Sequence, residues 1–186
     1  MLTTDLLAIT DLRERAARLL MQAAPLANLQ FEDAVIVIDA MEPVFVRTGL
    51  IVMEQGEAAE TDYMALVLEG EVRAESGTGV TGEEVVVSVI GPGSLIGEMG
   101  IIDGGPRSAT CTAATDLLVA VLSRDSFRQL MSENPAVAAR LILAVAKRLS
   151  DRLRETNRKF KTLSQVSRAL QQELDATHAV NQRLLS

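Results

Sequence analysis

Residues 93–114 have the sequence GSLIGEMGIIDGGPRSATCTAA, which is the most informative stretch of the chain. Four glycines lie between Gly91 and Gly100, and they allow the backbone to approach a ligand closely. Backbone N–H groups exposed in such a turn, at the start of a short helix, can bind an anion. Arg107 follows Glu98 by nine residues. Because an arginine fork pairs well with a phosphate and a carboxylate suits a ribose hydroxyl, the stretch predicts a site for a sugar and a phosphate.

The sequence around this stretch has the texture of an all-β domain. Between residues 43 and 122, short apolar runs alternate with turns that contain glycine. The runs are 44–46, 50–53, 63–68, 71–74, 85–90, 108–113 and 117–122. Strands this short at this spacing predict a β-sandwich or barrel.

Helices are predicted before the β region. Residues 5–23 are amphipathic, and Pro25 ends the pattern. Its apolar face comprises Leu12, Ala16, Leu19 and Leu20. Residues 31–41 begin with an acidic first turn, which favours a second helix. The β-branched run at 35–38 would suit a strand equally well, so both alternatives stay open there.

The C-terminal third predicts helices only. Residues 124–132 suit a short helix, and Asn134-Pro135 then begins a new one with proline in its first turn. Because no further Pro or Gly follows, a single helix of about fifty residues is expected. A 4-3 spacing from Leu149 to Leu184 is apolar at seven of its eleven positions, which predicts an imperfect coiled coil. A helix with one apolar stripe needs a partner, and a second copy of the chain, giving a homodimer, is the simplest.

These textures divide the chain into three predicted parts. They are an N-terminal helical extension at 1–29, a β domain at 30–148 and a C-terminal helix or coiled coil at 149–186. Charge follows a similar division: residues 1–146 carry a net charge of −12, and residues 147–186 carry +5. An asymmetry this sharp indicates two parts with different roles.

Composition excludes several classes of function. The 186 residues suffice for one ordinary domain plus an appendage. One cysteine, Cys111, and one histidine, His178, exclude a disulfide framework and argue against a zinc site within one chain. Neither a signal peptide nor an apolar run long enough to span a membrane is expected, which predicts a soluble cytoplasmic protein. With no nucleophile–base pair and no metal cluster, we expect neither an enzyme nor a bound cofactor.

The central stretch resembles the phosphate-binding cassette of the cyclic-nucleotide-binding domains. That cassette has Gly-Glu, then small and apolar residues, then Pro-Arg-Ser-Ala, as at 97–98 and 106–109 here. The resemblance covers roughly residues 30–155 and is strongest to the family of the bacterial catabolite activator protein. It includes residues 49–57, the turn at 68–72 and Asn134-Pro135. It implies a mainly β fold with flanking helices: a double-stranded β-helix (jelly-roll) β-roll followed by a long C-terminal helix.

The resemblance also implies roles for matching residues. Glu98 would accept a hydrogen bond from the ribose 2′-hydroxyl, and Arg107 would pair with the cyclic phosphate. Ser108 would donate to the same phosphate from its hydroxyl and backbone N–H. The backbones of Gly97 and Met99 would complete the cradle. A surface ion pair without a ligand is the alternative role for Glu98 and Arg107, since some members of the fold bind nothing.

The resemblance says less about which residues recognise the base. Val87 matches an apolar strand position that packs on the base. In relatives the long C-terminal helix caps the base, and the residues there are Asp151, Arg152 and Leu153. Their side chains differ from those of the catabolite activator protein, so its adenine contacts do not carry over. Ser108 could also help to hold a guanine. Cyclic AMP is favoured over cyclic GMP because it is the commoner ligand in the bacterial family.

The expected function is therefore a non-catalytic bacterial sensor that relays nucleotide binding through its dimerising helix to an unidentified protein partner. A ligand-free β-roll scaffold that uses the same coiled coil is the alternative. The basic segment at 152–161 could contact nucleic acid, but charges spread along a helix more often form a solvated face. Because no helix-turn-helix follows the β-roll, nucleic-acid binding is not expected.

Overall fold

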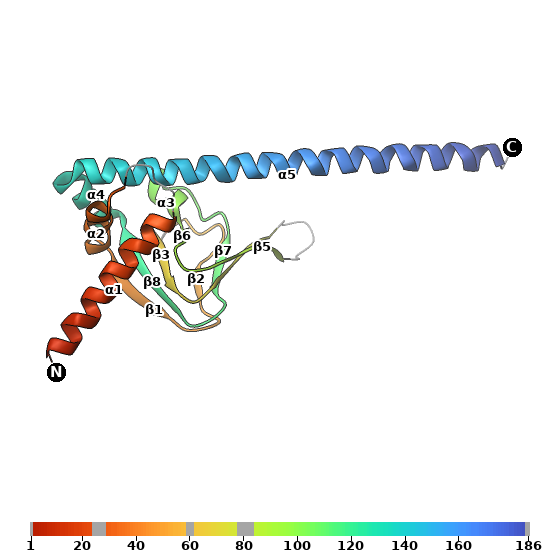
Figure 1. Cartoon of the computed structure of the whole chain (residues 1–186). Helices are drawn as coiled ribbons and strands as arrows, with labels where there is room; N and C mark the ends of the chain where they lie inside the picture. Colours follow the sequence, from red (N-terminus) through yellow and green to blue (C-terminus); the bar gives the residue numbers. More distant parts are fainter. Residues whose placement is uncertain (1, 24–28, 59–61, 78–83, 185–186) are drawn as a thin grey trace. The chain divides into compact units, whose positions relative to one another are not determined.

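The computed structural model describes residues 2–23, 29–58, 62–77 and 84–184 (Figure 1). The elements are α1 (Leu2–Ala23), α2 (Phe31–Asp39), β1 (Glu42–Val46), β2 (Ile51–Met53), β3 (Tyr63–Glu69), β4 (Val72–Gly77), β5 (Glu84–Ile90), β6 (Leu95–Ile96), α3 (Glu98–Asp103), β7 (Thr110–Ala113), β8 (Leu117–Ser123), α4 (Arg124–Glu133) and α5 (Pro135–Leu184). Each apolar run predicted as a strand coincides with one of these strands. The two-residue strand β6 has no such run and was not predicted.

The strands form two antiparallel four-stranded sheets. Their orders are β1-β8-β3-β6 and β2-β7-β4-β5. The chain passes between the sheets at almost every connection, and only β4 and β5 are consecutive strands that pair with each other. Such a path closes the two sheets into a roll. The predicted fold class, a β-roll with flanking helices and a long C-terminal helix, is confirmed.

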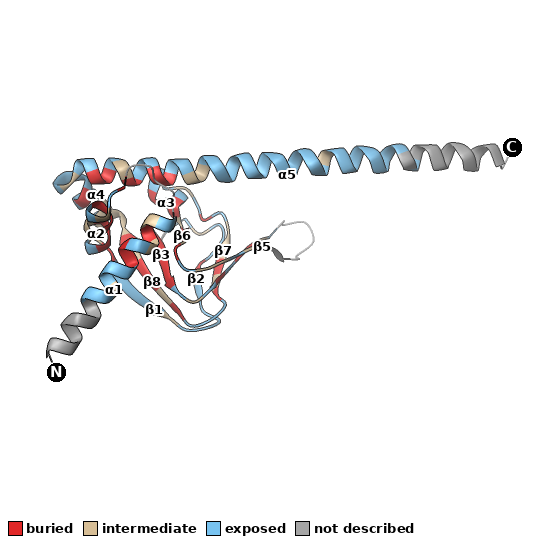
Figure 2. Cartoon of the chain, in the orientation of Figure 1, coloured by how far each residue is buried: buried red, intermediate tan, exposed pale blue. Residues whose placement is uncertain are grey.

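The core between the sheets is aliphatic. Its buried cluster comprises Met53, Ala65, Val67, Val72, Ala74, Ile96, Cys111, Ala113, Leu117 and Val119. Both sheets contribute, and Figure 2 shows the buried residues concentrated on the strands and on the helix faces that cover them. Tyr63 packs against the margin of this cluster.

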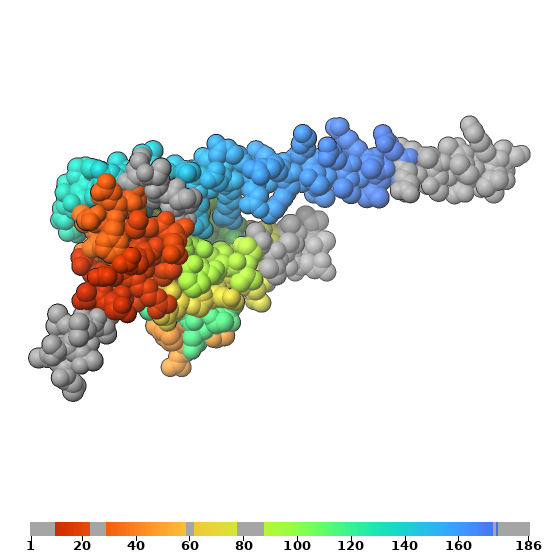
Figure 3. Space-filling view, in the orientation of Figure 1, coloured from red at the N-terminus to blue at the C-terminus, as the bar shows by residue number. Residues whose placement is uncertain are grey.

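The helices α1 and α2 pack on each other, and in the space-filling view their described residues form one continuous surface (Figure 3). The segment that could have been a strand is a helix because its apolar residues Ala34, Val37 and Ile38 recur at helical spacing and are buried together. Asp33 accepts a hydrogen bond from the N–H of Gln30 at 3.1 Å, which caps the helix.

The next helices begin at well-defined caps. The N–H of Ser126 donates to the Ser123 hydroxyl at 3.1 Å and starts α4. Pro135 then begins α5, as the sequence predicted. The first turns of α5 belong to the N-terminal unit, where the side chain of Arg140 donates to Asp33 at 2.7 Å. Its buried residues there are Val137, Ala138, Leu141, Ala144 and Val145.

The molecule divides into two units, Met1–Val145 and Ala146–Ser186. The second is helical throughout its described length. Six of the large apolar side chains described in it are exposed: Leu153, Phe160, Leu163, Val166, Leu170 and Leu174. None of the helices in the described ranges is long and apolar enough to cross a membrane.

Two turns meet around Asp116 at one end of the roll. The N–H and hydroxyl of Thr48 both donate to the Asp116 carboxylate, at 3.0 and 2.9 Å, and they lower the pKa of that carboxyl. Gly70 lies against the backbone of Asp116 with φ +83°, and a Cβ there would stand 2.2 Å from the Asp116 carbonyl oxygen. Gly70 is therefore required both by its conformation and by space.

We expect Gly70→Ala to destabilise the fold by about 3 kcal/mol, because it combines left-handed strain with a backbone clash. Gly49→Ala is the matched control. Gly49 has φ +85° but nothing lies within 4 Å of its missing Cβ. Its substitution should cost only about 1 kcal/mol of strain. Chemical denaturation of the two variants measures the difference, and equal losses would contradict the steric explanation.

Candidate ligand-binding site

The cassette predicted from the sequence is built around the short helix α3. Strand β6 leads into Gly97, which has φ +75° and precedes Glu98, the first residue of α3. A Cβ on Gly97 would stand 2.6 Å both from the Nη1 atom of Arg107 and from the terminal methyl of Met53. A glycine is thus needed here so that the arginine and the core methionine can both approach the start of α3.

The side chain of Arg107 is buried and is held by hydrogen bonds to the backbone. Only 5% of its surface is exposed. Its Nη1 donates to the carbonyl oxygens of Tyr63, at 3.0 Å, and of Gly97, at 3.2 Å. Its backbone is held as well, because its N–H donates to Glu57 and its carbonyl accepts from the N–H of Gly56, at 3.0 and 2.9 Å. The guanidinium therefore has a fixed orientation beside the start of α3.

Tyr63 completes this arrangement, and the sequence analysis missed its role. The guanidinium carbon of Arg107 lies 4.4 Å from the centre of the Tyr63 ring. The Tyr63 hydroxyl donates to the Val52 carbonyl at 2.5 Å, which fixes the ring. An arginine over an aromatic face gains a cation–π attraction. The available signal was that Tyr63 is the only tyrosine of the chain and begins a strand, which alone did not connect it to Arg107.

The other predicted cradle residues adjoin this centre. Glu98 is 4% exposed in the first turn of α3, where a carboxylate is favoured. Met99 is exposed at 41% on the same helix. Ser108 is exposed and follows Arg107 directly. The structure thus brings Gly97 and Arg107 into contact and places the remaining three beside them in the chain. Their roles toward a ligand stay predictions.

The two residues predicted to contact the base belong to other elements of the chain. Val87 is in β5, where the register against β4 shifts between Ala74 and Glu75, but its side chain lies outside the described residues. Arg152 lies in the helical unit Ala146–Ser186 and is exposed. Both roles stay predictions.

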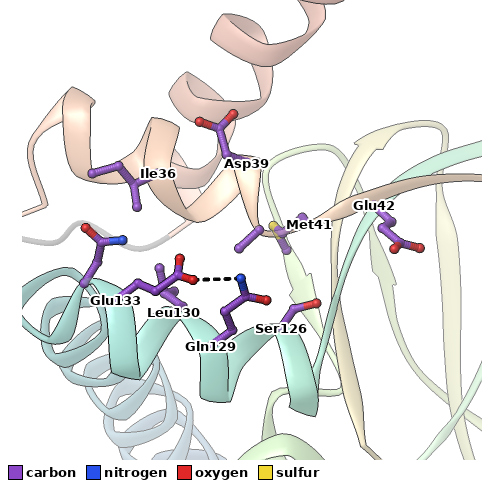
Figure 4. Close-up of a pocket in the computed structure, with 10 residues that line it drawn as sticks. Ile36, Asp39, Met41, Glu42, Ser126, Gln129, Leu130 and Glu133 are labelled. Carbon is purple, nitrogen blue, oxygen red and sulfur yellow. Dashed lines mark hydrogen bonds between the residues drawn. The ribbon is translucent and has the colours of Figure 1, made fainter.

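A separate groove of about 450 Å³ lies between α2 and α4 (Figure 4). Its residues include Ile36, Asp39, Gln129, Leu130 and Glu133, and it contains none of the cassette residues. Three of its polar side chains are engaged within the chain, since Gln129 donates to Glu133 at 2.8 Å and Arg13 donates to Asp39 through two nitrogens. The groove is therefore distinct from the predicted ligand site.

The chemistry of the cassette suits a small ligand that carries a phosphate. The planar fork of a rigidly held guanidinium is well matched to two phosphate oxygens. A buried carboxylate at the start of the neighbouring helix can accept hydrogen bonds from hydroxyl groups. Among the described residues no cluster of three or more His, Cys, Asp and Glu side chains could hold a metal ion.

The chain is similar in sequence to known proteins. Residues 43–134 match the cyclic nucleotide-binding domain. The chain is 35% identical over 103 residues to the cyclic AMP receptor protein of Thermus thermophilus, covering 55% of this chain and 46% of that protein. It spans about half the length of the curated relatives it matches first.

Two solved structures extend the likeness. A cyclic nucleotide-binding domain from Methylobacillus flagellatus has a TM-score of 0.69 at 28% identity, covering 77% of this chain and 79% of that one. The N-terminal domain of a transcriptional regulator from Streptomyces coelicolor has a TM-score of 0.62 at 32% identity, covering 71% and 93%. With the cassette residues gathered at the start of α3 in a β-roll, the chain belongs to the cyclic nucleotide-binding domain family, whose model it matches over residues 43–134.

Proposed function

We propose that this protein is a non-catalytic sensor of a cyclic nucleotide, with cyclic AMP favoured over cyclic GMP. The observation that carries the proposal is the buried Arg107, held by Tyr63 and Gly97 at the start of the cassette helix. Arg107 binds the cyclic phosphate, Ser108 adds its hydroxyl and N–H, and Glu98 accepts the ribose 2′-hydroxyl. The backbones of Gly97 and Met99 line the same cradle.

The preference for cyclic AMP is supported by a relative. The Thermus thermophilus relative is by name a cyclic AMP receptor. Val87 against the base and Arg152 as its cap complete the proposed site, but neither side chain distinguishes adenine from guanine. Cyclic AMP is accordingly the first ligand to test.

We place the output of the sensor on α5. Its first turns bury Val137, Leu141 and Val145 in the N-terminal unit, and the same helix continues without a break into the second unit. Exposed leucines and a phenylalanine follow along that continuation. Apolar side chains exposed along a helix favour association with another helix. We propose that α5 pairs with its counterpart in a homodimer and relays binding to a protein partner.

A ligand-free scaffold with the same helix pairing is the alternative function. A sensor binds a ligand in the cassette, whereas a scaffold leaves the cassette empty. Ligand binding to the wild-type protein therefore decides between them.

For the wild-type protein we expect saturable binding of cyclic AMP in calorimetry, with weaker binding of cyclic GMP and none of cyclic di-GMP. Arg107→Ala should weaken cyclic AMP binding roughly 100-fold or more, because it removes the charge that faces the phosphate. Arg47→Ala, at an exposed turn of the roll, is the control and should bind normally. Unchanged affinity in Arg107→Ala would refute the site, and a wild-type protein without any response would favour the scaffold.

The role of Glu98 is testable by removing either partner of its hydrogen bond. We expect the wild-type protein to lose roughly tenfold in affinity when cyclic AMP is replaced by its 2′-deoxy analogue. Glu98→Ala should lose affinity for cyclic AMP but show little further loss with the analogue, since the bond is already absent. A full additional loss in the variant would mean that Glu98 does not contact the ribose. Calorimetry of the four combinations gives the coupling.

Helix pairing is testable by charge substitution on and off the apolar stripe. Leu163→Lys with Leu170→Lys places two charges on the stripe, and we expect a monomer in light scattering after size exclusion. Gln165→Lys with Gln172→Lys adds the same charges two residues further on, on another face of the helix, and should leave the dimer intact. A wild-type protein that is monomeric, or a control that dissociates equally, would exclude pairing through this stripe.

A further inference from the structure

Two arginines hold the cassette helix, one at each end. Arg107 donates to the carbonyl of Gly97, which precedes α3. Arg124 donates through Nη2 to the carbonyl of Gly100 in α3 at 2.7 Å. Only the first arginine belongs to the cassette. The second is the first residue of α4, and nothing in the proposed function gives it a role.

The contact of Arg124 secures a helix that is weak on its own. Helix α3 has six residues and forms few hydrogen bonds within itself. The Gly100 carbonyl also accepts from the N–H of Gly104, at 2.9 Å, where φ is +68° and the helix ends. A cation at the carbonyl end of a helix is electrostatically favoured. Arg124 thus reinforces the capping turn that ends α3.

The position of Arg124 in its own helix points the same way. It lies in the first turn of α4, where the helix dipole disfavours a cation. A neutral residue there would serve α4 better, so the charge is explained by its contact with α3. Its backbone is also fixed, because the N–H of Arg124 donates to the Asp62 carbonyl at 2.6 Å.

Both arginines are anchored to neighbouring residues at the start of β3. Arg124 bonds the carbonyl of Asp62, and Arg107 bonds the carbonyl of Tyr63. The two arginines that contact α3 are therefore both bonded to the same short segment, Asp62-Tyr63. If the Gly100 end came loose, Glu98 and Met99 would lose their fixed relation to Arg107.

We propose that Arg124 is a positioning residue for the ligand site, which it keeps in binding geometry by holding the C-terminal end of α3. The inference rests on the proposed function. Arg124 touches no ligand itself and acts through the Gly100 carbonyl.

The test uses the full chain with Arg124→Met, Arg124→Gln and Arg124→Lys. Arg128→Met is the matched control: Arg128 lies on the same helix, its side chain is 64% exposed and it pairs only locally with Asp125. The measurements are cyclic AMP affinity by calorimetry, amide hydrogen exchange of Gly104, and thermal midpoint without ligand.

We expect Arg124→Met and Arg124→Gln to bind cyclic AMP roughly tenfold more weakly and to exchange the Gly104 amide faster. Their thermal midpoints should stay near wild type, since a cation is removed from the start of α4. A purely structural role would instead lower midpoint and affinity together. Arg124→Lys keeps a charged donor and should recover most of the affinity. If Arg124→Met does not fold, Arg124→Gln is compared with the wild-type protein in its place.

Affinity within about twofold of wild type in Arg124→Gln would overturn the inference. An affinity loss with unchanged Gly104 exchange would also overturn it, because the effect would not pass through α3. If the wild-type protein binds cyclic AMP but the Arg124 variants give either of these two results, the proposed function stands and Arg124 has no role in it. If the wild-type protein binds no cyclic nucleotide, both are refuted.

Discussion

Arg107 places a positive charge in a position that is almost closed to water, and the structure around it compensates for that charge. Removing a guanidinium from water costs several kcal/mol. Hydrogen bonds from a charged donor return about 1.5–3 kcal/mol each, and an aromatic face adds about 0.5–2 kcal/mol. The carbonyls of Tyr63 and Gly97 and the ring of Tyr63 supply contributions of that size. An anionic ligand would strengthen the same electrostatics, which is why a buried arginine is a reasonable basis for a binding site.

Several other features follow from accommodating this side chain. Gly97 has φ +75°, which favours glycine, and a Cβ there would displace the ends of the Arg107 and Met53 side chains. The Tyr63 hydroxyl is bonded to Val52, so the ring under the guanidinium cannot rotate away. Both contacts reach into the core of the roll, since Met53 belongs to the buried cluster and Tyr63 packs against it. The candidate site is thus continuous with the packing of the core.

The fold class was predicted from the resemblance of the cassette motif to the cyclic-nucleotide-binding domains, together with the short apolar runs that indicated strands. The local signal of Pro135 also located the start of a helix. Helix and strand both stayed open for residues 31–41 because of their β-branched run, and the joint burial of Ala34, Val37 and Ile38 is a tertiary contact that the sequence did not show. Tyr63 and Arg124 were missed for the same reason: their contacts with Arg107 and Gly100 depend on the path of the chain through both sheets.

The helical unit carries charged and apolar side chains. The charged ones can pair with one another along a single helix, whereas the apolar ones cannot be buried by it. Its charges are partly paired along the helix, as in Lys159 with Glu155 at 2.7 Å and Arg154 with Asp151 at 2.8 Å. The first pair lowers the pKa of the Glu155 carboxyl, so its small stabilising effect is present at neutral pH and lost as the pH falls through that lowered pKa. Such local pairing reduces the charge that a polyanion could use. The apolar residues have no comparable partner within a single straight helix, because side chains on one stripe cannot bury one another. These exposed apolar residues and locally paired charges support the proposed pairing of α5 with a second helix over nucleic-acid binding.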